Sequence, residues 1–458
     1  MSQPADGGAG GGAPGGAPGT ADPDVLVRRD TVLIIAVRID EPPGAPFHPG
    51  PLVRVWRRRR GSGDVDSSTR RRVGHTDQRL VPLLWEPTVR WHTEEVDPRP
   101  SPGGFVLSAV ELIRLNDSAL GMLRRMDVSP TANGVALLHG SLPAKPPAQM
   151  PGALRNCADL DPHHADGVHR AWAADQLPPG CRISTAEREA VYCTLLTARG
   201  DLPRLTTDST PPGSESWSAV DQWLWQMYHA TNFPPGPEAR AKLETLRLQL
   251  PSKVSGVLGL RGLVLVGSEP DPGRDDRGNY YNGATHSVAT LYADALALAR
   301  LHEIVLAAFG AEVARIAEGM PRQRVVAQLE RDLLVFRRGY WAADFGRTET
   351  ATTLLRTWRL SAGLADEVQS LKDDLGELSR QVLSRETEAS NAILGLLAAV
   401  GLPLSVGLGI WQGLPGSGGA ALALTLVITG VTIALLLLVF PGLRRLFVHL
   451  FQWETWRE

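Results

Sequence analysis

Two apolar segments near the end of the chain limit its fold more than any other feature. Residues 391–411 and residues 419–440 contain no ionisable side chain, and only a short uncharged loop separates them. About 20 consecutive apolar residues are enough for a helix to cross a bilayer. Arg444 and Arg445 directly follow the second segment. The positive-inside rule therefore predicts a two-helix transmembrane hairpin in a plasma membrane, with both chain termini in the cytoplasm.

Small residues recur every four positions in the first apolar segment, at Gly401, Ser405 and Gly409. This spacing places them on one helix face, where small side chains let a second helix approach closely. We expect helix packing along this face, within a homo-oligomer that also contacts the lipid bilayer.

A heptad pattern precedes the first apolar segment. Its apolar positions, called the stalk seam below, are Leu364, Val368, Leu371, Leu375, Leu378 and Val382. Their alternating spacing of four and three is typical of a coiled coil. Two interpretations remain open: packing within one chain, as in a helical bundle, or pairing between subunits. Because no proline occurs between Arg322 and Gly401, we expect the stalk and the first span to form one helix.

The rest of the chain predicts an α+β protein with a cytoplasmic α/β domain. Short apolar runs bounded by Gly, Pro or Asp predict strands at 31–38, 52–56, 134–139 and 257–266. Residues 216–231 are predicted to be helical, and Ser184 with Glu187 resembles a capping box at the start of another helix.

The predicted order of domains follows from these patterns. It is a disordered Gly/Ala/Pro tail (1–22), an α/β domain (23–283), a helical bundle with the coiled-coil stalk (284–390), two spans (391–411 and 419–440) and a cytoplasmic tail (441–458).

Motifs that would indicate catalysis are missing from the sequence. It contains no Walker lysine loop, no Gly-x-Ser-x-Gly elbow and no His-Glu-x-x-His helix. The segment from Cys157 to His169 gathers potential zinc ligands, but its spacing matches no common metal pattern. We therefore expect no enzyme activity, no cofactor and no metal site.

Charge gives little indication of a partner. The net charge is -2, so nothing in the composition favours nucleic acid. Arginines cluster at 57–60 and 70–72, where they would contact either anionic lipid or nucleic acid, or simply form a solvated loop. We favour the solvated loop, and we expect no nucleic acid partner.

The layout of cytoplasmic α/β domain, stalk helix and terminal hairpin resembles the CorA family of divalent cation channels. Pro403-Leu404-Ser405 and Gly409-Ile410-Trp411 stand where that family has Pro-Leu-Thr and Gly-Ile-Tyr. Gln412-Gly413-Leu414 replaces the Gly-Met-Asn signature that follows. The resemblance covers about the last 120 residues, and it implies a pentamer.

The whole chain also resembles the membrane component of actinobacterial CATRA conflict systems, which have caspase-like and tetratricopeptide-repeat partners. The similar stretches are Trp223-Leu224-Trp225, 292–296, Tyr340-Trp341 and 391–403. This resemblance implies a role in defence or cell death, together with such a partner protein.

Two functions follow as expectations. The first is a non-enzymatic membrane effector or scaffold of a conflict system, because the hairpin lacks the ion-selecting signature. The alternative is a divergent divalent cation channel. In that case the polar residues Asn391, Ser405 and Gln412 would line the pore.

Overall fold

The computed structural model describes most of the chain, with several gaps. The described residues are 25–40, 47, 49–54, 67–93, 96–97, 100–127, 129–205, 217–233, 236, 238–250, 254–269, 280–319, 322–413, 419–420, 423, 426–427 and 430–431. The predicted N-terminal and C-terminal tails and Arg57 to Arg60 lie outside these residues.

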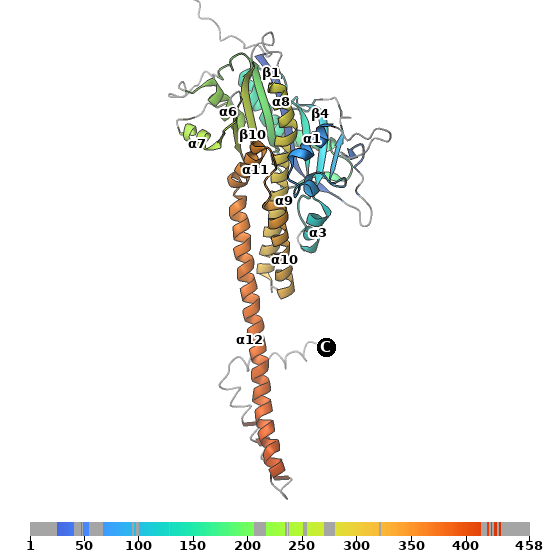
Figure 1. The fold of residues 1–458 in the computed structure, drawn as a ribbon, viewed down its shortest axis with the longest axis vertical. Helices are drawn as coiled ribbons and strands as arrows, with labels where there is room; N and C mark the ends of the chain where they lie inside the picture. The colour runs from blue at the N-terminus through green and yellow to red at the C-terminus, as the bar shows by residue number, and fades with distance from the viewer. Residues whose placement is uncertain are drawn as a thin grey trace, which may run out of the picture. The chain divides into compact units, whose positions relative to one another are not determined.

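The chain combines one large sheet with several helices (Figure 1). The strands are β1 (Leu26–Ile39), β2 (Val53–Arg54), β3 (Arg90–Thr93), β4 (Val106–Arg114), β5 (Gly134–Ser141), β6 (Cys181–Ile183), β7 (Val191–Arg199), β8 (Arg247–Leu248), β9 (Val254–Gly259) and β10 (Gly262–Glu269). The helices are α1 (Ser67–His75), α2 (Val81–Leu84), α3 (Asp117–Arg125), α4 (Met150–Ala158), α5 (Val168–Asp175), α6 (Ala219–His229), α7 (Ala239–Leu246), α8 (Tyr280–Ser287), α9 (Ala293–Glu318), α10 (Gln323–Phe336), α11 (Glu349–Ser361) and α12 (Leu364–Gly413). Short turns are η2 (Pro147–Gln149), η3 (His164–Gly167), η5 (Val288–Tyr292) and η6 (Arg337–Trp341).

The sheet has the strand order β2-β3-β4-β5-β1-β7-β10-β9-β8, and β6 pairs with β1. Its pairs are antiparallel except that of β7 with β10, which is parallel. In the register of the central strands, Ile34 faces Leu137 on one side and Val191 on the other. The predicted mixture of α and β structure is confirmed.

Both faces of the central sheet are covered. Leu33 and Ile35 of β1 belong to a core cluster with Leu154 of α4 and Trp223 of α6. Side chains alternate across a strand, so the intervening Ile34, which is also fully buried, faces the opposite layer. Residues of η5 contact β1 and β7, and η5 leads directly into α9. These layers fix η5 against the middle of the sheet.

The run predicted as one strand at 257–266 is instead a hairpin of β9 and β10, so that prediction is wrong. The two strands pair antiparallel through Gly262 and Gly259. Gly262 has φ of 138°, and a Cβ atom there would meet the main chain of Tyr192. Only glycine fits this conformation and this close approach, so an apolar run does not by itself reveal the turn inside it.

The capping box predicted at Ser184 and Glu187 does not start a helix. The segment that follows is the strand β7, whose residues Val191 to Ala198 are all buried. The Ser184 hydroxyl instead accepts a hydrogen bond from Ala186 N in a turn. Burial on both faces of the sheet explains why this strand has no alternation of apolar and charged residues, which makes it resemble a buried helix in sequence.

Other predicted elements are confirmed. Strands form at β1, β2 and β5, and α6 forms with the Ser218 hydroxyl accepting a hydrogen bond from Asp221 N at its start. The stalk and the first apolar segment belong to the single helix α12. The six stalk-seam residues are 1–7% exposed in a single chain, so atoms of the same chain cover them and no second subunit is required.

Contacts divide the chain into two units. One contains Met1–Arg315 and Asp332–Leu371, and the other contains Ile316–Arg331 and Lys372–Glu458. Within the described residues, no helix is both long enough and apolar enough to cross a membrane. Most of the second predicted span, 419–440, and several side chains of the first lie outside those residues, so the hairpin stays a prediction.

Candidate ligand-binding site

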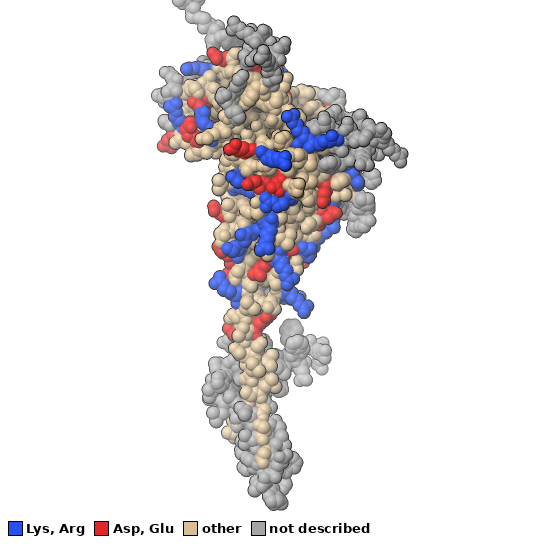
Figure 2. Space-filling view, viewed as in Figure 1, with Lys and Arg blue, Asp and Glu red and all other residues tan. Residues whose placement is uncertain are grey.

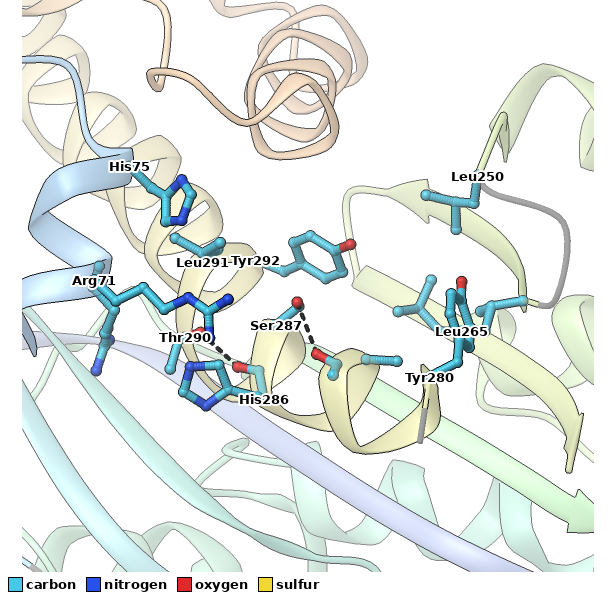
Figure 3. Close-up of a pocket in the computed structure, with 14 residues that line it drawn as sticks. Arg71, His75, Leu250, Leu265, Tyr280, His286, Ser287, Thr290, Leu291 and Tyr292 are labelled. Carbon is cyan, nitrogen blue, oxygen red and sulfur yellow. Dashed lines mark hydrogen bonds between the residues drawn. The ribbon is translucent and has the colours of Figure 1, made fainter. Parts of the chain in front are cut away.

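A cavity of about 540 Å³ lies in the first unit, between α1, the continuous α8–η5 segment and the β9–β10 hairpin (Figure 3). Small-molecule sites have volumes of about 300–1,000 Å³, so the cavity is large enough for an organic ligand. Its described wall has two chemically different sides, called the basic side and the apolar side below.

The basic side carries Arg71 and His75 from α1, together with His286 from α8. Arg71 and His75 are four residues apart and therefore share one face of the helix. Arg71 is exposed and has no ion pair with any described residue. None of the described lining residues is acidic, so this side of the cavity favours an anion.

Glycine holds α1 in the position that directs His75 to the cavity. Gly346 has φ of 148°, and a Cβ atom there would lie 2.0 Å from His75 O. This contact lets Thr76 pair with Gly346 and lets Thr348 Oγ1 approach His75 Nδ1 at 3.3 Å. A larger residue at position 346 would push the end of α1, at His75 and Thr76, away from the segment that contains Thr348.

The apolar side consists of Leu250, Val254 and Leu265, next to Tyr280 and Tyr292. In the close-up, Tyr280 stands beside Leu265, and Tyr292 lies between them and the basic side (Figure 3). Burial raises the pKa of both tyrosines, so their hydroxyls stay protonated at neutral pH. Apolar and aromatic walls favour the body of an organic ligand over a bare ion.

A π-helical turn, η5, forms the floor of the cavity and includes Tyr292. Such turns are rare and frequently occur at functional sites. Beside it, Ser287 Oγ donates to Gly283 O at 2.9 Å and Thr290 Oγ1 donates to His286 O at 2.5 Å. Both hydroxyl groups therefore donate to main-chain carbonyl groups of the helix and not into the cavity.

Directly behind the basic side lies a buried ionic cluster of Arg72, Arg90, Glu111 and Asp294. Arg72 NH2 lies 2.7 Å from Asp294 Oδ1, and Arg72 NH1 lies 2.9 Å from Glu111 Oε1. Arg90 contacts the same two carboxylates and stacks on Trp85, with 4.3 Å between its Cζ and the ring centroid. Two positive and two negative charges make the cluster neutral, which is the condition for burying charges stably.

The pKa values in this cluster follow from burial and charge together. Burial opposes ionisation of Glu111, but Arg72 and Arg90 outweigh it and hold its pKa well below the usual range. The same balance, with Asp294 and Glu111 outweighing burial, raises the pKa of Arg72. Burial is the main reason that the pKa of His139 falls to about 4, so His139 is neutral at physiological pH.

Arg72 connects the cavity with α9. It lines the cavity, while its guanidinium pairs with Asp294 in the first turn of α9, two residues after η5 ends. A ligand that displaced α1 would therefore act on a charge pair at the beginning of a 26-residue helix.

The arginines at 70–72 are not a solvated loop, so that interpretation is wrong. They lie on α1, and Arg72 is only 8% exposed because the ionic cluster encloses it. Charges inside apolar stretches were the available signal: Arg90 lies in TVRWH, Glu111 in AVELI and Asp294 in YADALAL. Opposite charges at such positions tend to pair, because an unpaired buried charge is strongly unfavourable.

The residues that the sequence singled out lie outside this site. Asn391, Gly401, Ser405 and Gly409 lie on α12 and are exposed in the single chain, while the side chain of Gln412 lies outside the described residues. The pore and packing roles stay predictions.

The Cys157 to His169 segment includes parts of α4, η3 and α5. Cys157 is buried, and burial raises the pKa of its thiol to about 12. His164 Nδ1 contacts the Asp159 carboxylate. Among the described residues, no group of three potential ligands is arranged to hold a metal ion.

Comparison with known proteins gives little further information. No known protein family and no curated protein matches the sequence. The CorA magnesium transporter from Methanocaldococcus jannaschii is similar in structure at 12% identity, with 57% of this chain and 92% of that chain covered and a TM-score of 0.24. This TM-score is too low to establish a shared fold.

Proposed function

We propose that this chain is a non-enzymatic, membrane-anchored effector or scaffold that binds a small ligand in the cavity of its first unit. The observation that carries the anchoring part is the contrast between two stretches of α12. The stalk seam is 1–7% exposed, whereas Ile393, Leu394 and Leu397 are 54–63% exposed. Described residues of the same chain cover the first stretch, but they do not cover the second.

A cluster of exposed aliphatic side chains is more stable in an apolar environment than in water. Burying one fully is worth about 1.5–3 kcal/mol relative to leaving it in water. No charged residue occurs between Glu388 and Gly413, and the residues of this part of α12 that are described show no charged side chain in the space-filling view (Figure 2). An uncharged helix that exposes leucine and isoleucine fits a bilayer better than water.

The chemistry of the cavity supports binding rather than catalysis. Its described lining offers guanidinium, imidazole and phenol groups but neither a carboxylate base nor a cysteine nucleophile. Cys193 is fully buried, and burial raises the pKa of its thiol, which opposes formation of the reactive thiolate.

Anchoring can be tested by placing two arginines in the first predicted span, as Leu394→Arg with Leu397→Arg. An arginine costs roughly 2.5–3.5 kcal/mol of insertion free energy at the centre of a span and less towards its ends, so two are introduced together. We expect most of the variant to leave the carbonate-resistant membrane fraction. Leu383→Arg is the matched control, because Leu383 is exposed on the same helix outside the span. Equal extraction of both proteins would refute membrane anchoring.

The same proposal, through the resemblance to conflict systems, includes a caspase-like or tetratricopeptide-repeat partner. Deleting the gene while keeping its neighbours intact should change phage resistance or viability. Unchanged resistance and viability would remove this part of the proposal without affecting the anchoring.

Ion flux separates an effector or scaffold from a cation channel. Purified protein in liposomes should pass no magnesium, cobalt or sodium ions if it is a scaffold. Flux that is reduced when the candidate pore-lining Ser405 is changed to Leu would assign the channel function instead.

A further inference from the structure

We propose that the cavity binds an organic phosphate ester: a compact anionic group held on the basic side and joined to a flat ring on the apolar side. This inference rests on the proposed function in one respect, because it takes the cavity to be the ligand site. It adds the chemical class of the ligand and the residues that distinguish its two ends.

The charge that selects the anion comes from Arg71. Arg72 also faces the cavity, but its charge is balanced by the carboxylates of Glu111 and Asp294 at 2.9 Å and 2.7 Å. Arg71, one residue earlier, is exposed and has no such partner among the described residues. An arginine presents several N–H donors in a planar fork, which suits a phosphate group better than a single ammonium does.

His75 adds a second contact on the same helix face, four residues from Arg71. Thr348 Oγ1 lies 3.3 Å from His75 Nδ1 and orients the ring. In Figure 3 the side chains of Arg71, His75 and His286 gather at the same end of the cavity. One compact anion can therefore meet more than one of these groups.

The opposite end selects the body of the ligand. Leu250, Val254 and Leu265 give an aliphatic wall, and Tyr280 adds an aromatic ring that is 37% exposed. Tyrosine is a good stacking surface for planar rings, and stacking of one base on an aromatic side chain is worth about 1–3 kcal/mol. A sugar-phosphate could extend past Tyr292 between the two ends.

Either part of such a ligand, bound alone, would leave one side of the cavity without a suitable partner. Inorganic phosphate would neutralise Arg71 but leave the apolar side in contact with water. An uncharged ring compound would cover the apolar side but leave the basic side without an anion. The volume of about 540 Å³ accommodates both parts together.

The proposal can be tested by calorimetric titration of the full chain in detergent with AMP, GMP, adenosine and inorganic phosphate. We expect one of the two nucleotides to bind at least about tenfold more tightly than adenosine or phosphate. Arg71→Ala should weaken nucleotide binding about 10- to 100-fold, since hydrogen bonds to charged groups are the strong ones. It should leave the binding of adenosine unchanged. Rising salt should weaken nucleotide binding, because Arg71 is exposed.

Two further variants separate the ends of the cavity. Arg70→Ala removes the same charge from the neighbouring position of α1, which does not line the cavity, and should bind like the unchanged protein. Tyr280→Ala should weaken the binding of both AMP and adenosine and leave that of phosphate unchanged. Unchanged melting temperatures would show that all three variants are folded.

Several results would overturn the proposal. Adenosine binding as tightly as AMP, or equal effects of Arg71→Ala and Arg70→Ala, would refute recognition of the anion. Phosphate binding as tightly as AMP would refute recognition of the ring. Absence of binding by all four probes at millimolar concentration, in protein that still inserts into membranes, would refute this ligand class and leave the anchoring intact.

Discussion

The first unit and the C-terminal part of α12 differ in which side chains they bury and which they expose. The first unit places four charged side chains, Arg72, Arg90, Glu111 and Asp294, at 0–8% exposure and pairs each with an opposite charge. The end of α12 places large aliphatic side chains at more than half of their full exposure. One region buries charge and the other exposes hydrocarbon.

This difference shows which region needs something beyond its own chain. The ionic cluster is neutral and internally paired, so these four charges need no partner from outside the chain. The exposed aliphatic stretch has no partner in the described chain, and apolar surface in water is unfavourable. A bilayer or a second helix would satisfy it, which is why the two regions call for different experiments.

The largest effect is expected from breaking the buried charge balance with Glu111→Gln. The change leaves Arg72 and Arg90 sharing one remaining carboxylate, and removing one partner of a buried pair costs about 3–5 kcal/mol. Chemical unfolding of the full chain in detergent would measure the loss. Asp344→Ala removes an exposed pair with Arg356 and should cost less than about 1 kcal/mol. Equal costs would mean that burial of the ionic cluster contributes nothing.

A second variant tests the boundary between the covered and the exposed parts of α12. Leu375→Ala removes a side chain that is 1% exposed, and buried Leu→Ala changes cost about 2–5 kcal/mol. Leu383→Ala, on the same helix at 49% exposure, should cost well under half as much. If melting temperatures fall equally, the stalk seam is not packed within the chain.

Acid should weaken the first unit through His139. Its pKa is about 4 in the folded chain against 6.5 for an ordinary histidine, so between these values the unfolded chain binds more protons. The stabilisation is therefore complete above pH 6.5 and is lost as the pH falls towards 4. At pH 5.5 the loss is about 1 kcal/mol. The low pKa of Glu111 acts in the same direction at still lower pH.

His139→Gln is the control for the acid effect, measured as melting temperature between pH 7.5 and pH 5.5. The variant should lose part of the decrease that the unchanged protein shows. The ionisable groups that act on His139 are Glu111, Arg72, Arg90 and His92, and all four are retained in the variant. An identical pH dependence in both proteins would show that His139 does not titrate in this range.

Local sequence patterns correctly predicted the elements that depend mainly on the spacing of nearby residues. The heptad spacing identified the stalk seam, and the absence of proline identified one continuous helix. The same reasoning failed at β7 and at the β9–β10 hairpin, because an apolar run looks alike in a buried strand, a buried helix and a hairpin with a hidden turn. Gly262 closes that turn only because of where Tyr192 lies.

The cavity was beyond reach from the sequence, although its residues are ordinary in type. Arg71 and Arg72 are adjacent in the same basic run, yet one lines an open cavity and the other is enclosed by Glu111 and Asp294. Those carboxylates are 39 and 222 residues away from Arg72 along the chain. Helix periodicity turns neighbouring side chains to different directions, but it does not say what each side will meet.

The sequence by itself determined where apolar side chains recur, and therefore the helical stalk and the two apolar segments that follow it. Tertiary structure alone decided which charges are paired and which are left facing a cavity. The physical reason is the distance along the chain over which each property is set. Hydrophobic periodicity is a property of consecutive residues, whereas the free energy of a buried charge depends on groups that are far away in the sequence. Those surroundings are assembled from β3, β4, α1 and α9, which only the folded chain brings together.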